Sequence, residues 1–377
     1  ILTPEIRKEE MGLRRGTGVL LAAALCFALL PRAGAAEVTV SAQSAVLMDA
    51  ESGRVLYAKD ADTPRLIAST TKLMTALVAL ESGHSLEEDV TIPAEAAGVE
   101  GSSLYLKAGE AVKLKTLLYG MLLHSGNDAA TAVALTCAGS LEAFAQKMNE
   151  KAQQLGMTNS HFTNPTGLDG EEHYSSAYDM ALLARACLAV PELKEITATR
   201  STTLEGRTFV NHNKLLWRYE GCVGMKTGYT QAAGRTLVSA AERDGMTLIA
   251  VTLNAPSDWA DHAAMLDYGF ESYHMEEAVT AGQSLCSLPV SGSLVPFVSL
   301  KAEETLRWPV GPGESLETHL ELGGLTSLEA PVQAGVPMGR VEVLLNGEVV
   351  GERDLSCAIA VHRDRQEHTG WLDWLFG

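Results

Sequence analysis

The spacing of apolar residues changes near residue 275, and this change constrains the fold more than any other feature of the chain. Before it, stretches with helical spacing, such as Leu73, Leu77 and Leu80, occur together with short apolar strands. After it, Gly and Pro are frequent and short alternating segments replace the helical pattern. We therefore predict an α/β (α+β) domain over 37–274 and a small all-β domain over 275–361.

Local signals place the elements of both domains. A hairpin is expected at 45–58, because two short apolar runs flank Glu51-Ser52-Gly53. A helix should open at Ser69 and stop at Gly83, and Ser140 should cap another. Further helices are predicted at 112–123, 128–138, 141–155, 176–189 and 259–269, and strands at 236–241, 247–253, 341–345 and 348–350.

The N-terminal segment has the layout of a secretory signal peptide. Arg14 and Arg15 follow Met11, Val19–Leu30 is an apolar run of twelve residues, and small residues follow at 33–36. Such a run is short for a bilayer span, which needs about 20 residues. We predict that 1–36 are removed and that the protein is exported, with 1–10 lying upstream of the true start. A retained N-terminal anchor is the alternative.

The balance of charges excludes some partners. The chain has 47 Asp and Glu residues and 29 Lys and Arg residues, which gives a net charge of −18. This argues against a nucleic-acid binder, which needs surplus cations for phosphate, and against polybasic docking on anionic lipid. Beyond residue 36 the cysteines are Cys137, Cys187, Cys222, Cys286 and Cys357. Their odd number and scattered spacing predict mostly buried free thiols, with one disulfide left open.

The first chemical motif is Ser69-Thr70-Thr71-Lys72. Residues three apart share a helix face, so the Lys72 amine could reach the Ser69 hydroxyl. A serine becomes a nucleophile when a neighbouring base takes its proton, and a lysine with a depressed pKa can be that base. Taken alone, the motif is equally a helix cap followed by a surface lysine.

Two further motifs follow along the chain. In Ser125-Gly126-Asn127 the serine could relay a proton, and the asparagine could bond a substrate carbonyl or orient the lysine. In Lys226-Thr227-Gly228 the cation and the hydroxyl suit a carboxylate, and the glycine would let a substrate backbone lie close to a strand edge. Taken alone, Ser125-Gly126-Asn127 is a sequence common in loops, and Lys226-Thr227-Gly228 could equally form a turn.

The three motifs together, in the order SxxK, SxN and KTG, carry a family resemblance. Over about residues 40–272 the chain resembles the penicillin-recognising serine enzymes, most of all the low-molecular-mass D-alanyl-D-alanine carboxypeptidases. Further similar segments are 67–75, 123–130, 161–168, 211–216 and 226–234. The resemblance implies a β-lactamase/transpeptidase-like domain with an antiparallel sheet flanked by helices, often followed by a β domain.

The resemblance also implies a reaction and its residues. The enzyme would remove the terminal D-alanine from peptidoglycan stem peptides through an acyl-enzyme, without a metal or organic cofactor, and β-lactams would trap it. The implied roles are Ser69 as nucleophile, Lys72 as base, Ser125 as proton shuttle, Asn127 as holder of the peptide carbonyl, Lys226 and Thr227 as carboxylate ligands beside Gly228, and the N–H groups of Ser69 and Tyr229 as oxyanion hole. A DD-endopeptidase or β-lactamase on the same scaffold, or a non-catalytic wall-binding protein, is the alternative.

Three other features bear on this reading. Some relatives hold the carboxylate with an arginine beyond KTG, but 254–262 contain none, which leaves Lys226 and Thr227 with Arg235 nearby. Pro191-Glu192 resembles a helix end more than a deacylating glutamate, and His124 is expected to line its loop. His161 and His173, with Glu171 and Glu172, lack zinc-like spacing.

The C-terminal tail, 362–377, is polar and then aromatic, with Trp371, Trp374 and Phe376 close together. Because Trp favours the membrane interface, we predict peripheral membrane contact through these side chains. A tail that folds back on the β domain, or a disordered one, is the alternative.

Overall fold

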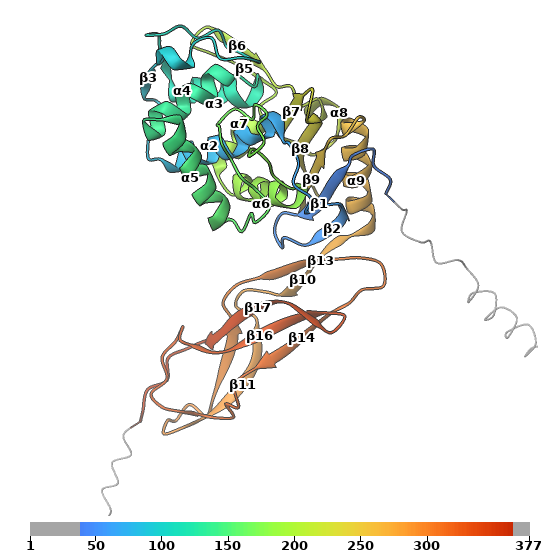
Figure 1. Cartoon of the computed structure of the whole chain (residues 1–377). Coiled ribbons are helices and arrows are strands. Elements are labelled where there is room, and N and C mark those ends of the chain that lie inside the picture. The colour runs from blue at the N-terminus through green and yellow to red at the C-terminus, as the bar shows by residue number, and fades with distance from the viewer. Residues whose placement is uncertain (1–37, 365–377) are drawn as a thin grey trace, which may run out of the picture. The chain divides into compact units, whose positions relative to one another are not determined.

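The computed structural model of the chain describes residues 38–364 (Figure 1). The predicted signal peptide and the aromatic tail lie outside the described residues. Over 38–364, none of the helices combines the length and the apolar character that crossing a bilayer requires.

A five-stranded antiparallel sheet forms the centre of the first domain. Its strand order is β2 (Val55–Lys59), β1 (Ser44–Asp49), β9 (Met246–Leu253), β8 (Gly234–Arg243) and β7 (Cys222–Thr230). The helix α9 (Asp258–Ser272) packs on β8 and β9, and α6 (Ala177–Leu188) packs on β1 and β9. Because both faces are covered, β1 is buried at every position, and its central residues, 45–48, form a continuous apolar run. At the edge opposite β2, β7 pairs only with β8 within the sheet.

Along the chain, most of the helices follow β2 and precede β7 (Figure 1). They are α2 (Lys72–Glu81), α3 (Leu114–Leu123), α4 (Asn127–Ala138), α5 (Leu141–Gln154), α6, α7 (Pro191–Ala198) and the short α8 (Leu215–Arg218), with the 3-10 turns η1 (Ala68–Thr71) and η2 (Ala94–Ala96). As predicted, Ser140 caps α5 and Gly83 follows α2 in the left-handed region. Buried alanines in α4 allow close packing at the centre of the core.

Several sequence predictions need correction. The helix predicted from Val112 begins at Leu114, because β4 (Ala111–Lys113) pairs with β3 (Asp89–Thr91) just before it. The hairpin of β5 (Ser201–Leu204) and β6 (Arg207–Val210) was not predicted. Pro191 starts helix α7 instead of ending one.

The second domain is all-β, as predicted. A six-stranded sheet has the order β14 (Leu316–Glu321), β16 (Pro337–Leu345), β17 (Glu348–Cys357), β12 (Phe297–Ala302), β11 (Ser284–Ser291) and β15 (Leu328–Glu329). A two-stranded sheet pairs β10 (His274–Val279) with β13 (Leu306–Val310). The predicted turn at Asn346-Gly347 joins β16 and β17 with both residues at positive φ.

Each domain has its own hydrophobic core, and we propose that the boundary lies near residue 275, where the second core begins. Within 38–364 all five cysteines are free. Cys187 and Cys357 are buried, whereas the other three are half-buried, so burial is less complete than predicted.

Candidate active site

The first motif spans the junction of η1 and α2. The Lys72 Nζ lies 2.9 Å from the Ser69 Oγ, as the spacing predicted. The preceding residue, Ala68, has φ +48°, a conformation that non-glycine residues rarely adopt and that occurs often at functional sites. The Thr70 hydroxyl bonds the Ile67 carbonyl at 2.6 Å, which holds the turn.

Lys72 is fully buried, so it is not a surface lysine. Besides Ser69, its Nζ contacts the Asn127 Oδ1 at 2.7 Å and the Thr166 carbonyl at 2.5 Å. Burial and the charge of Lys226 set the pKa of Lys72 well below its usual value, and Asp128 opposes the shift. A neutral amine donates two hydrogen bonds and accepts one, so it could donate to Asn127 and Thr166 and accept the Ser69 proton.

The Thr166 carbonyl is a partner of Lys72 to which the sequence assigned no role. It sits in a turn organised by Asn164, whose Oδ1 accepts from the Thr166 N at 3.1 Å and the Gly167 N at 2.8 Å. Gly167 has φ +83°, and a Cβ there would lie 1.9 Å from the Ala68 carbonyl oxygen. The Asn-Pro-Thr-Gly sequence was the available signal, because Asn and Gly organise such turns.

His173 connects the Thr163 segment to Thr71, the residue before Lys72. Its Nδ1 accepts from the Thr163 N at 3.1 Å, so its Nε2 carries the hydrogen and donates to the Thr71 Oγ1 at 2.8 Å. Burial, and secondarily His161 and Lys72, lower the pKa of His173 to about 4. Between residues 38 and 364, no three His, Cys, Asp or Glu side chains are grouped to hold a metal ion.

The second motif connects α3 to α4. Ser125 has φ +66° and only 6% exposure. The Asn127 amide nitrogen donates to the Glu100 carbonyl at 2.6 Å, while its oxygen faces Lys72. These contacts favour the lysine-orienting role that the sequence allowed for Asn127 over a direct hold on the substrate carbonyl.

The third motif lies inside the edge strand β7, not in a turn beside a strand. Lys226 is 1% exposed, and its Nζ donates to the Thr227 carbonyl at 2.7 Å. Burial lowers the pKa of Lys226 to about 7. A Cβ on Gly228 would lie 3.0 Å from the Ser69 N and 2.3 Å from the Thr236 Oγ1, so glycine lets the strand approach the serine.

The eight predicted site residues therefore fall into two layers. Ser69, Ser125, Thr227, Gly228 and Tyr229 line one pocket of about 310 Å³. Lys72, Asn127 and Lys226 are buried and are not part of its lining. Sequence reasoning missed that Asp258 and Trp259, at the start of α9, line the same pocket.

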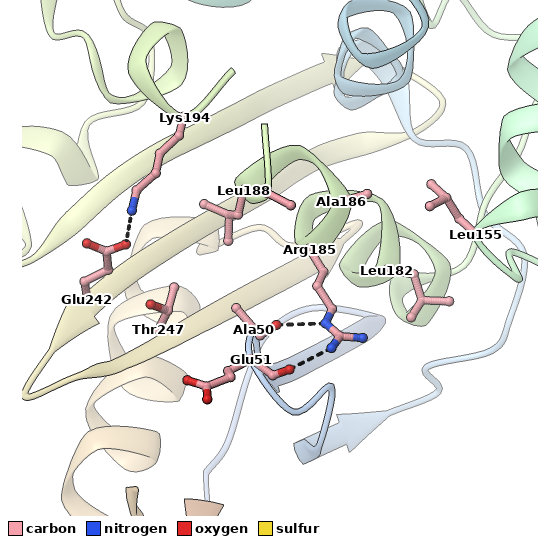
Figure 2. Close-up of a pocket in the computed structure, with 11 residues that line it drawn as sticks. Ala50, Glu51, Leu155, Leu182, Arg185, Ala186, Leu188, Lys194, Glu242 and Thr247 are labelled. Atoms are coloured by element: carbon pink, nitrogen blue, oxygen red, sulfur yellow. Dashed lines mark hydrogen bonds and ion pairs between the residues drawn. The ribbon is translucent and has the colours of Figure 1, made fainter. Parts of the chain in front are cut away.

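A larger pocket of about 550 Å³ lies elsewhere in this domain, between α6, α7 and the ends of β1, β8 and β9 (Figure 2). Both cations in its lining already have partners. Arg185 donates to the carbonyls of Ala50 and Glu51 at 2.8 and 2.7 Å, and Lys194 pairs with Glu242 at 2.6 Å. The lining includes no serine, cysteine or histidine, so volume alone does not mark this pocket as the active site.

Two residues weighed in the sequence have no place in the pocket lining. Glu192 is exposed in the first turn of α7. The ring of His124 lies 5.1 Å from that of His212, between centroids, which is consistent with the predicted role in its loop.

Comparison with known proteins identifies the family of the chain. The family model for D-alanyl-D-alanine carboxypeptidases matches residues 32–257. D-alanyl-D-alanine carboxypeptidase DacF of Bacillus subtilis is 35% identical over 329 residues, covering 84% of this chain and 85% of its own. DacA of Escherichia coli is 34% identical over 362 residues, covering 89% and 90%. The structure of penicillin binding protein 5 from Haemophilus influenzae superposes with a TM-score of 0.76 at 31% identity, covering 87% of this chain and 100% of its own. The chain belongs to the D-alanyl-D-alanine carboxypeptidase family.

Proposed function

We propose that the protein is a serine D-alanyl-D-alanine carboxypeptidase that removes the terminal D-alanine from peptidoglycan stem pentapeptides. The observation that carries this proposal is the buried Lys72, whose amine faces the Ser69 hydroxyl in a pocket bounded by the edge strand β7. Membership of the family supplies the substrate class.

In the proposed acylation step, Ser69 Oγ attacks the carbonyl between the two D-alanines and its proton passes to neutral Lys72. The N–H groups of Ser69 and Tyr229 stabilise the oxyanion. The approach of Gly228 to the Ser69 N supports this pairing, because it brings the backbone of β7 next to the nucleophile.

The leaving D-alanine must then gain a proton on its nitrogen. We assign this transfer to Ser125, which lines the pocket with Ser69: its hydroxyl protonates the nitrogen and regains a proton from Lys72, so the lysine is neutral again. Asn127 and Thr166 hold the amine of Lys72 in place throughout. Water, activated by the same lysine, then hydrolyses the acyl-enzyme. β-Lactams would acylate Ser69 by the same route.

At the carboxylate end of the substrate, Thr227 is positioned on the pocket wall. Direct contact between Lys226 and the carboxylate, which the sequence predicts, has little support in the geometry, because the ammonium is buried and donates to the Thr227 carbonyl. We assign Lys226 an electrostatic role instead: its charge helps keep Lys72 neutral.

This function requires the protein to act outside the cytoplasmic membrane, where peptidoglycan is located. The predicted signal peptide supports export, and the aromatic tail supports the further proposal of peripheral membrane contact. Both segments lie outside the described residues.

The decisive experiment incubates the protein with a pentapeptide ending in D-Ala-D-Ala and analyses the products by mass spectrometry. We expect release of D-alanine, and none from Ser69→Ala. Cleavage of cross-linked dimers in place of pentapeptide would indicate an endopeptidase, and rapid turnover of penicillin a β-lactamase. If a fluorescent penicillin labels neither protein, or labels Ser69→Ala as well as wild type, the mechanism is wrong.

A further inference from the structure

The pocket around Ser69 contains two cations in its lining, Lys214 and Arg235. Lys226 is not in that lining, since its ammonium is buried beneath the strand. A carboxypeptidase must nevertheless distinguish a free α-carboxylate from a peptide bond, and a buried cation bonded to its own strand is poorly placed to do so. The discriminating cation should therefore lie on the pocket wall.

Arg235 meets this requirement by its position in the sheet. In the register of β7 and β8 it lies directly opposite Tyr229, and Thr227 lies opposite Leu237. Side chains paired in this way point to the same face, and alternate residues of a strand share that face. Thr227, Tyr229 and Arg235 therefore share one face of the sheet, and all three line the pocket.

Two residues of α9 hold the Arg235 side chain. Its Nε lies 3.0 Å from the Asp258 Oδ1, and its guanidinium lies 5.9 Å from the centre of the Trp259 ring. The contact with Asp258 uses the Nε edge of the guanidinium. The side chain is still 44% exposed, so the fork that binds carboxylates with two parallel hydrogen bonds remains open to solvent.

Asp258 explains why an arginine is needed at this position. It is 3% exposed, lies in the first turn of α9 and accepts from the Trp259 N at 3.0 Å. A carboxylate in the pocket wall would repel the carboxylate of the substrate unless a cation separated the two. Arg235 contacts Asp258 and also lines the pocket, so it is placed to separate the two carboxylates.

We propose that Arg235, held by Asp258 and Trp259, is the residue that recognises the free α-carboxylate of the terminal D-alanine. This inference rests on the proposed carboxypeptidase function and assigns its selection for chain ends to a residue of β8. Asp258 is then a positioning residue, because it acts on the substrate only through Arg235.

The test compares substrates with and without the carboxylate. We would measure kcat/KM for a peptide ending in D-Ala-D-Ala and for its C-terminal amide, and the rate of acylation by benzylpenicillin and by its methyl ester. The wild-type enzyme should prefer the free acid in both series. Arg235→Ala should lower the free-acid rates by about 10–100-fold, the range expected for a lost charge-assisted bond, and leave the amide and ester rates nearly unchanged.

Arg243→Ala is the matched control. Arg243 lies in the same strand, 3.6 Å from Asp267 and stacked on Tyr219, but it is outside the lining of this pocket. Its replacement should leave the acid-to-amide ratio unchanged, and Lys214→Ala should also leave it unchanged. If Lys214→Ala abolishes the preference and Arg235→Ala does not, the assignment to Arg235 is wrong.

A double variant separates attraction by Arg235 from repulsion by an exposed Asp258. Arg235→Ala with Asp258→Asn carries neither charge, and we expect it to remain unselective. Recovery of the wild-type ratio in this variant would overturn the proposal, because Asp258 alone would then explain the loss. Arg235→Lys keeps the charge but loses the paired N–H donors of the guanidinium, so it should retain part of the preference for the free acid. This variant replaces Arg235→Ala if Arg235→Ala does not fold.

The same measurements test the role of Arg235 separately from the proposed carboxypeptidase activity. If wild type releases no D-alanine but is acylated by benzylpenicillin, the carboxypeptidase proposal fails. The comparison of benzylpenicillin with its methyl ester still tests Arg235 in that case. An equal acid preference in wild type and Arg235→Ala would refute the assignment in either series.

Discussion

Gly228→Ala should disable acylation by adding a single methyl group. The strand β7 passes so close to the nucleophile that a Cβ on Gly228 would lie 2.3 Å from the Thr236 Oγ1, 3.0 Å from the Ser69 N and 3.1 Å from the Ile67 carbonyl oxygen. Gly228 has no positive φ, so alanine is compatible with the backbone and the effect comes from space alone.

The expected magnitude follows from these contacts. Ordinary van der Waals separation for a Cβ begins near 3.4 Å, so the methyl group and Thr236 must move apart by about 1 Å. Thr236 is not free to rotate without loss, because its hydroxyl bonds the Ile67 carbonyl at 3.1 Å. A displacement of about 1 Å in an active site can cost about 100-fold in rate, or roughly 2.7 kcal/mol of transition-state stabilisation. Overpacking should also lower the free energy of unfolding by about 1–3 kcal/mol.

The assay is the second-order rate constant for acylation by a fluorescent penicillin, with thermal unfolding measured in parallel. Gly170→Ala is the control, since a Cβ there would lie 3.7 Å from its nearest neighbour. Thr236→Ala removes the closest atom, so Gly228→Ala should slow acylation less in the Thr236→Ala background than in the wild-type protein. A Gly228→Ala rate within twofold of wild type, in a folded protein, would refute the reasoning.

Four further predictions concern residues in the core or beside it. Lys72→Ala should slow acylation by about 10²–10⁴-fold in a folded protein, and normal penicillin labelling would exclude Lys72 as the base. Lys226→Met removes a like charge from Lys72 and should raise its pKa; the midpoint of the pH–acylation profile should then move to higher pH, and a downward shift would contradict the electrostatic role. Asn164→Ala should release the turn that presents the Thr166 carbonyl, lowering stability by about 1–3 kcal/mol in urea unfolding together with acylation; a stability loss with an unchanged acylation rate would separate the turn from catalysis. His262 is buried between Ser239 and Thr252 with a pKa of about 3, so the unfolded state alone binds its proton between about pH 6.5 and 3, and stability should fall as pH falls through that window. His262→Gln should flatten this slope by up to about 1.4 kcal/mol per pH unit, and an unchanged slope would contradict the assignment.

Local order in this protein could be predicted from the sequence because it depends on neighbours a few residues apart. The cap at Ser140 and the turn at Asn346-Gly347 use side chains and backbone of the same segment. The approach of Lys72 to Ser69 is also local, since one helical turn brings them together. The main errors came where a distant segment decided the outcome: β3 captured the start of the predicted helix at 112–123 as a strand.

The sequence by itself determined the candidate reactive groups, their order along the chain and the change from a mixed α/β pattern to an all-β pattern. Only the tertiary structure decided which of these groups are accessible and which are charged. The sequence predicts Lys226 as a carboxylate ligand, but in the fold its side chain is buried. Arg235 lines the pocket, where its side chain contacts Asp258 at the start of α9. The physical reason is that a pKa and an exposed fraction depend on the segments packed around a side chain, and pairings between distant segments leave no signal in local spacing.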